Sequence, residues 1–214
     1  MNDKRNWAER KDKFVEAIRK LVIELSIPAV RFIGKIKSPY SHKKAIREYY
    51  KIVNSLKPLD VILSNTYGHL SNLFNPGKWK HAIIYLGVEN DIPMVAEAIG
   101  EGVVKRPLVE CIAEKDRIAV MRLKDKIKKV EERKALEWAN KQVGKGYDYR
   151  FDMETYHKFD NFYCSEYAYY TLKQAKPKMN FTLKEYLGAK TVKPVDFIYA
   201  RDKFDLIYKT KKYI

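Results

Sequence analysis

A cysteine stands where a helix is expected to begin in the segment Asn161-Phe162-Tyr163-Cys164-Ser165-Glu166-Tyr167-Ala168-Tyr169-Tyr170-Thr171-Leu172. Behind the cysteine, residues of one helix face recur at helical spacing, namely Tyr167, Ala168, Thr171, Leu172 and Ala175. Just ahead of it, Asp160 and Asn161 are residue types that form turns and helix caps. The pattern predicts that Cys164 lies near a helix N-terminus.

A cysteine in that position is suited to nucleophilic chemistry. The free N–H groups and the positive end of the helix dipole favour thiolate over thiol, and lower a cysteine pKa from about 8.5 to about 3.5–7.5. The same N–H groups can hold an oxyanion. The alternative interpretation is a structural cysteine that packs the helix against a sheet. A histidine partner elsewhere in the chain would decide for catalysis.

The composition is that of one catalytic-sized domain in a chain of 214 residues. Its two cysteines, Cys111 and Cys164, are too few for a disulfide framework, so reduced thiols are expected, although one bridge between them stays open. We interpret Cys111 as structural, because no histidine is close to it in sequence. No apolar run reaches the ~18–20 residues of a membrane span, and the N-terminus lacks the apolar core of a signal peptide. A cytoplasmic location is expected, with peripheral membrane association as the alternative.

The charge is strongly positive, with 43 Lys and Arg against 27 Asp and Glu and a net charge of +16. Such a charge attracts anionic partners, whether nucleic acid, acidic lipid headgroups or wall polymers. Residues 3–26 read as a basic amphipathic helix that packs on the domain or lies on an anionic membrane, and residues 43–53 read as a second helix. We therefore divide the chain into an N-terminal helical extension, residues 1–56, and a catalytic domain, residues 57–214.

Two predicted strands, residues 81–87 and 94–98, flank the turn sequence Val88-Glu89-Asn90-Asp91 and should form an antiparallel hairpin. If Leu86 faces Ile92 across a five-residue loop, counting back along both strands places His81 opposite Glu97. A register shift of one residue would put the two side chains on opposite faces.

The remaining elements complete a mixed fold. Strands are expected at residues 61–64, 103–106, 117–123 and 204–208. A helix is expected at 124–143, ended by Gly144 and Gly146, and a turn at 194–198.

Five segments in this order resemble the permuted papain-like amidases, the YaeF/YiiX-like branch of the NlpC-type cysteine hydrolase superfamily. They are residues 60–64 (DVILS), 79–87 (WKHAIIYLG), 97–103 (EAIGEGV), 144–152 (GKGYDYRFD) and 163–166 (YCSE). The resemblance runs from about Pro58 to Tyr208. It implies an α+β, circularly permuted papain-like fold, in which an antiparallel sheet packs against the helix that carries the cysteine, with an N-terminal helical extension.

The resemblance also implies a catalytic triad. The family's cysteine corresponds to Cys164, its histidine to His81, and the polar residue that orients the imidazole to Glu97. Cys164 would attack a carbonyl as thiolate, His81 would take and return the proton, and Glu97 would fix the histidine tautomer. Tyr163, Tyr67 and Asp148 are candidate substrate-binding residues. His42, His69 and His157 are interpreted as lying outside the site.

The expected function is cleavage of an amide, such as a cell-wall peptide bond, or a related acyl bond, without a metal or organic cofactor. The partner would be a peptide or a small acyl-containing substrate, with an anionic polymer or membrane surface as a further candidate. A lipid acyl hydrolase or transferase is one alternative. Another is a catalytically silent basic module that binds nucleic acid or anionic membrane, supported by sixteen tyrosines able to stack on bases. Specific nucleic-acid binding is not expected, since no such motif is recognisable.

Overall fold

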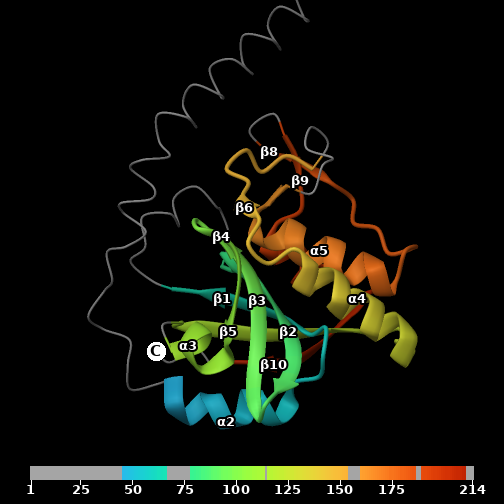
Figure 1. Cartoon of the computed structure of the whole chain (residues 1–214). Coiled ribbons are helices and arrows are strands. Elements are labelled where there is room, and N and C mark those ends of the chain that lie inside the picture. Colours follow the sequence, from blue (N-terminus) through green and yellow to red (C-terminus); the bar gives the residue numbers. More distant parts are fainter. Residues whose placement is uncertain (1–44, 67–77, 114, 154–159, 187–188, 211–214) are drawn as a thin grey trace, which may run out of the picture.

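The computed structural model describes residues 45–66, 78–113, 115–153, 160–186 and 189–210. In this part of the chain a six-stranded sheet has helices on both faces (Figure 1). Its strand order is β10-β5-β1-β2-β3-β4, and every neighbouring pair is antiparallel. The strands are β1 (Val61–Asn65), β2 (His81–Glu89), β3 (Ile92–Ile99), β4 (Gly102–Pro107), β5 (Arg117–Leu123) and β10 (Phe204–Lys209).

The described helices are α2 (Ala45–Ser55), α3 (Leu108–Ala113), α4 (Lys129–Lys141), α5 (Cys164–Ala175) and α6 (Pro194–Tyr199). Two small sheets accompany them. The parallel pair is β6 (Gly146–Tyr147) with β7 (Asn161–Phe162), and the antiparallel pair is β8 (Lys184–Tyr186) with β9 (Ala189–Thr191).

The α+β class and the six strands of the main sheet agree with the sequence predictions, apart from end positions. Two elements differ. Residues 194–198, predicted as a turn, belong to the short helix α6, in which proline is tolerated because the first helical turn needs no N–H donor. The helix predicted from residue 124 begins only at Lys129. The predicted helix at 3–26 lies outside the described residues.

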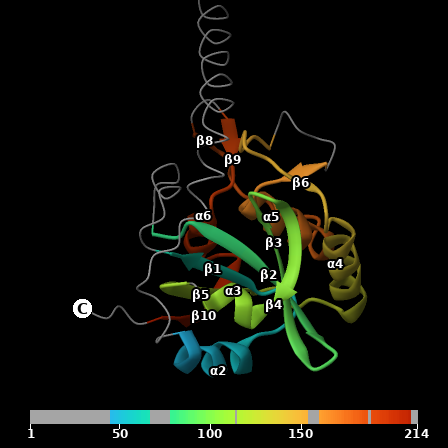
Figure 2. The same cartoon turned by 60° about the vertical axis from the view of Figure 1, so that its left-hand side comes forward.

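The sheet is buried on both faces, because successive residues of a strand point to opposite sides and each side has its own cover. One set, including Leu63, Ala82 and Ile84, forms a core with residues of α4 and α5. The other set, including Ile83 and Val95, forms a second core with residues of α2 and α3. Figure 2 shows these helix pairs on opposite sides of the sheet.

Helix α2 closes the second core. Its Ile52 is fully buried there together with Leu108 and Ile112 of α3. The predicted boundary between residues 56 and 57 therefore falls just after a helix that covers the sheet. None of the described helices is both long and apolar enough to cross a membrane.

The hairpin of β2 and β3 is tighter than predicted. The strands are joined by Asn90 and Asp91 alone, which have φ values of 48° and 64°. Positive φ at both central residues is the geometry of a type I′ turn, which suits the right-handed twist of a two-residue hairpin. The five-residue loop from Gly87 to Asp91 and the Leu86–Ile92 pairing were therefore wrong.

A β-bulge then corrects the register. Near the turn Gly87 pairs with Met94, but further along Tyr85 pairs with Val95, so Leu86 is the extra residue. Gly87 accommodates the bulge at a φ of 110°. Continuing the ladder sets Glu97 opposite Ile83, and His81 two positions further along, rather than directly opposite as predicted. Because the offset is two residues, His81 and Glu97 share a face. Without the bulge they would point to opposite sides of the sheet.

A close approach of the backbone at Gly102 to that of Lys145 brings the segment around Tyr147 to the start of α5. At Gly102, with a φ of 115°, an added Cβ would lie 2.2 Å from the carbonyl oxygen of Lys145. The close approach allows Val103 N–H to donate to that oxygen at 2.7 Å. The chain then continues into β6, where Tyr147 pairs with Phe162 of β7.

We predict that Gly102→Ala destabilises the protein more than Gly144→Ala. Both glycines have positive φ, but an added Cβ at Gly144 meets nothing within 4 Å, so only Gly102 carries the clash with backbone. The difference in free energy of unfolding should be about 1–3 kcal/mol, the usual cost of overpacking. Urea denaturation of both variants measures this difference. Equal losses of unfolding free energy would contradict a stabilising role for the close approach at Gly102.

Candidate active site

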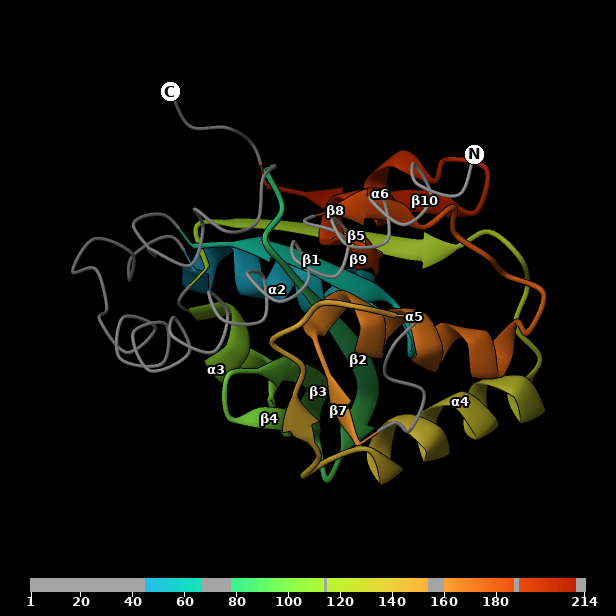
Figure 3. The ribbon, with the colours of Figure 1, turned by 90° about the horizontal axis from the view of Figure 1, so that it is seen from above.

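Helix α5 packs against α4 and against strands β2 and β3 of the main sheet (Figure 3). Nine of its twelve residues are buried, and the hydroxyl of Tyr167 donates to the carbonyl of Ala139 on α4 at 3.1 Å. Cys164 is the first residue of α5, as the sequence pattern predicted. Its position is therefore determined by the packing of the whole helix.

The entry into α5 differs from the prediction that Asp160 and Asn161 cap it. Asn161 belongs to the short strand β7, and Tyr163 in extended conformation precedes the helix. The Tyr163 hydroxyl accepts hydrogen bonds from Thr191 Oγ1 at 2.9 Å and from the N–H of Val192 at 3.2 Å. The start of the helix is set by the pairing of β7 with β6 and by Glu166, whose Oε2 accepts from the backbone N–H of Tyr163 at 3.4 Å.

The side chains of Cys164 and His81 meet at the start of β2, joined by a hydrogen bond. Burial opposes thiolate formation, but the charge and hydrogen bond of His81 and the N–H groups of Ala82 and Ser165 outweigh it, and the pKa of Cys164 is lowered. Burial likewise opposes imidazolium, but the charges of Cys164 and Glu97 and their hydrogen bonds raise the pKa of His81 to about 9. Both changes favour a thiolate–imidazolium pair over the neutral thiol and imidazole.

Glu97 of β3 completes the group. Its side chain is fully buried, and His81 Nε2 donates to its Oε2. Burial alone would protonate the carboxyl, but the hydrogen bond and charge of His81 and the charge of Arg106 bring its pKa well below the usual range. Because Nε2 is engaged by Glu97, Nδ1 is the ring nitrogen left for Cys164. The three predicted triad residues are thus in one chain of contacts.

The predicted substrate-binding residues are placed differently. Asp148 is buried and accepts from the N–H of Arg150 at 2.8 Å, so its carboxyl organises the 148–152 loop. Tyr163 is buried, with its hydroxyl on the 191–192 segment. Tyr67 lies outside the described residues, as do His42, His69 and His157. Substrate binding by Tyr163, Tyr67 and Asp148 stays a prediction.

The sequence reasoning missed two neighbours of the triad. Burial, followed by the nearby Cys164 charge, raises the pKa of Tyr147 well above its ordinary value, so its hydroxyl stays protonated. Arg106 of β4 holds the other oxygen of Glu97. Cross-strand counting from β3 to β4 could have found Arg106, whereas the β6–β7 pairing that places Tyr147 leaves no pattern in so short a stretch.

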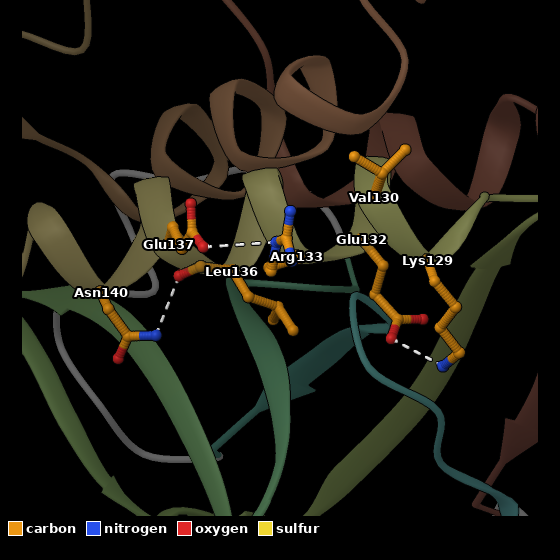
Figure 4. Close-up of a pocket in the computed structure, with 7 residues that line it drawn as sticks. All are labelled: Lys129, Val130, Glu132, Arg133, Leu136, Glu137 and Asn140. Atoms are coloured by element: carbon orange, nitrogen blue, oxygen red, sulfur yellow. Dashed lines mark hydrogen bonds and ion pairs between the residues drawn. The ribbon is translucent and has the colours of Figure 1, made fainter.

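A separate hollow lies along α4, away from the triad (Figure 4). Ion pairs Lys129–Glu132 and Arg133–Glu137 lie along it, and it includes no residue of the Cys164 site. Among the described residues no three His, Cys, Asp or Glu side chains are grouped as ligands of a metal ion.

Comparison with known proteins identifies a family and a fold for this chain. The model of the permuted papain-like amidase enzymes of the YaeF/YiiX, C92 family matches residues 55–203, more than two thirds of the chain. The crystal structure described as metalloprotein YiiX from Escherichia coli O157:H7 superposes with a TM-score of 0.61 and 20% identity, over 73% of this chain and 98% of that one. That similarity supports the fold. No curated protein sequence matches the chain. By its family match and by its fold, the chain belongs to the permuted papain-like amidases of the YaeF/YiiX family.

Proposed function

We propose that the protein is a cysteine amidase that cleaves amide bonds of peptides through Cys164, His81 and Glu97. The observation that carries this proposal is the chain of contacts from the Cys164 sulfur through the His81 ring to the buried Glu97 carboxylate. Family membership supports the hydrolytic chemistry. The contacts of Cys164, His81 and Glu97 give each residue a separate role in the two half-reactions.

In the first half-reaction the Cys164 thiolate attacks the amide carbonyl carbon. A C–S bond forms, and the electron pair of the C=O bond moves onto oxygen. When the tetrahedral adduct collapses, the C–N bond breaks and the His81 imidazolium gives its proton to the departing nitrogen. The amine leaves neutral, and a thioester on Cys164 and a neutral His81 remain.

In the second half-reaction water replaces the amine. Neutral His81 takes a proton from the water as its oxygen attacks the thioester carbon. The C–S bond breaks, the carboxylic acid leaves, and the thiolate–imidazolium pair is restored. Glu97 accepts from Nε2 throughout, which keeps Nδ1 directed at the sulfur and the substrate.

The negative oxygen of the adduct needs donors close to the sulfur. The first N–H groups of a helix have no acceptor within the helix, so the backbone N–H of Cys164 is the first candidate. The hydroxyl of Tyr147, which stays protonated beside Cys164, is the second. Both come from backbone elements fixed by the β6–β7 pairing.

The substrate class is proposed as an amide of a peptide, with cell-wall peptides as the first candidates and lipid acyl groups as the alternative. The net charge of +16 suggests that an anionic polymer or membrane surface brings the enzyme to its substrate. Aminomethylcoumarin amides of short peptides and p-nitrophenyl acyl esters, assayed side by side, separate the two chemistries. A thioester on Cys164 trapped by mass spectrometry from an amide supports the proposal. Turnover of amides with no adduct on Cys164 would contradict it.

The pH profile of kcat/KM should be bell-shaped. Thiolate is present above the lowered pKa of Cys164, so activity rises with pH through that value. Imidazolium is present below about pH 9, so activity falls as the pH rises through the pKa of His81. The profile is measured in buffers of constant ionic strength. An alkaline limb near the ordinary histidine value of about 6.5 would show that the pair does not form.

A further inference from the structure

The buried carboxylate of Glu97 is held on both oxygens by different partners. Oε2 accepts from His81, whereas Oε1 accepts from Arg106 Nε at 2.6 Å and also pairs with Arg106 Nη2. The thiol of Cys111 donates to Oε1 at 3.3 Å. Three donors on Oε1 leave Oε2 as the oxygen that serves the histidine.

The strand register explains why Arg106 reaches this carboxylate. In the β3–β4 ladder Val95 is opposite Arg106 and Glu97 is opposite Val104. Arg106 and Glu97 are therefore diagonal neighbours on one face, a spacing that a long side chain can bridge. The face is that of the second core, where α3 brings Cys111 onto the same oxygen.

A buried carboxylate without enough partners takes up a proton. If Glu97 lost one of its partners, the proton shared by Glu97 and His81 would move to Glu97. The imidazole ring of His81 beside Cys164 would then become neutral. The charged groups that face Glu97 are His81 of β2, Arg106 of β4 and Lys115 after α3, with the neutral thiol of Cys111. Of the two cations other than His81, Arg106 is the one in direct contact.

We propose that Arg106 is a positioning residue of the triad: its guanidinium fixes Glu97 Oε1, which keeps the carboxylate ionised and Oε2 on His81, and so maintains the imidazolium that stabilises the Cys164 thiolate. The proposal rests on the proposed Cys164–His81–Glu97 chemistry. It adds that the charge state of the nucleophile depends on a residue outside the Cys164–His81–Glu97 group.

The sign of the effect follows from charge alone. Loss of the Arg106 charge disfavours thiolate directly, and a proton that moves to Glu97 removes the imidazolium as well. Both consequences raise the pH at which Cys164 ionises. In Arg106→Gln the pH profile of Cys164 alkylation by iodoacetamide should move about one pH unit or more to higher pH. At a pH below the thiol pKa the alkylation rate then falls about tenfold or more, because raising the thiol pKa by about 1 lowers the thiolate fraction tenfold there. Arg106→Lys keeps the charge and loses the planar fork, so its fall should be smaller.

The structure offers a matched control. Arg122 of β5 donates from Nε and Nη2 to the buried carboxylate of Asp60, at 2.7 and 2.6 Å. The side chains of Arg122 and Arg106 are similarly exposed, at 25% and 27%. Their carboxylate partners Asp60 and Glu97 are 1% and 0% exposed. Arg122→Gln should lower stability in a similar way and leave the pH dependence of Cys164 alkylation unchanged.

The experiment follows alkylation of Cys164 by mass spectrometry from about pH 4 to 10 in the full chain and the three variants, with thermal melting as the check of folding. A displacement to higher pH in Arg106→Gln but not in Arg122→Gln supports the proposal. A folded Arg106→Gln with the profile of the unsubstituted protein overturns it, leaving Arg106 as a structural ion pair. If Arg106→Gln does not fold, Arg106→Met serves instead, since it keeps the aliphatic stem and removes the charge; a folded Arg106→Met with the profile of the unsubstituted protein overturns the proposal equally. Slow alkylation of Cys164 in the unsubstituted protein would instead refute the proposed nucleophile itself.

Discussion

Replacing Cys164 with alanine is expected to abolish amide hydrolysis, and replacing His81 with alanine is expected to have the same effect. The sulfur forms the bond to substrate, and without the imidazole the thiol is neither ionised nor able to protonate the leaving amine. Losses of about a millionfold in kcat are typical when a nucleophile or its base is removed. The measurement is steady-state turnover of the best amide substrate.

The double variant should be no slower than either single variant, because residues that act as one unit fail together. Folding is checked by thermal melting, which Cys164→Ala should hardly change. A multiplicative loss in the double variant would mean that the two side chains act in separate steps, against the contact between them.

Replacing Glu97 with glutamine is expected to lower kcat by about tenfold to ten-thousandfold, the upper value being the cost of holding the wrong histidine tautomer. The amide keeps an acceptor for the His81 ring but loses the charge that stabilises imidazolium. It also leaves the guanidinium of Arg106 without its anionic partner. Activity and the alkylation rate of Cys164 should therefore fall together.

Asp60→Asn is the matched control for that substitution. Asp60 is a second buried carboxylate held by an arginine of the sheet, and it has no contact with the triad in the described part of the chain. Its loss should reduce stability and leave kcat close to that of the unsubstituted protein. If Asp60→Asn lowers kcat as much as Glu97→Gln, the effect at Glu97 is one of folding and not of catalysis.

Local patterns predicted much of this molecule because they report local physics. The apolar run within residues 117–123 and the helical spacing after Cys164 gave β5 and α5 with their ends correct or nearly so. Residue order, with the histidine strand before the cysteine helix, was sufficient to suggest the permuted family that the family model confirms.

The register of the β2–β3 hairpin was harder to predict, because two of its features were missed. The Asn90-Asp91 turn and the bulge at Leu86 each displace the pairing, and their sum preserves the face shared by His81 and Glu97. The predicted pair was found in contact, although the direct cross-strand pairing behind the prediction was wrong. Arg106 and Tyr147 were missed because their places depend on pairing between segments distant in sequence or too short to show a period.

The central claim is that Cys164 and His81 form a thiolate–imidazolium pair, and the pH dependence of iodoacetamide alkylation tests it most directly, without a known substrate. Cys111 is an internal reference in the same experiment, since burial and the neighbouring Glu97 charge raise the pKa of its thiol. We expect Cys164 to react rapidly at about pH 6, well below the ordinary thiol pKa of about 8.5, while Cys111 stays unmodified. Slow reaction of both cysteines in the folded protein, rising only above about pH 8.5, would contradict the account.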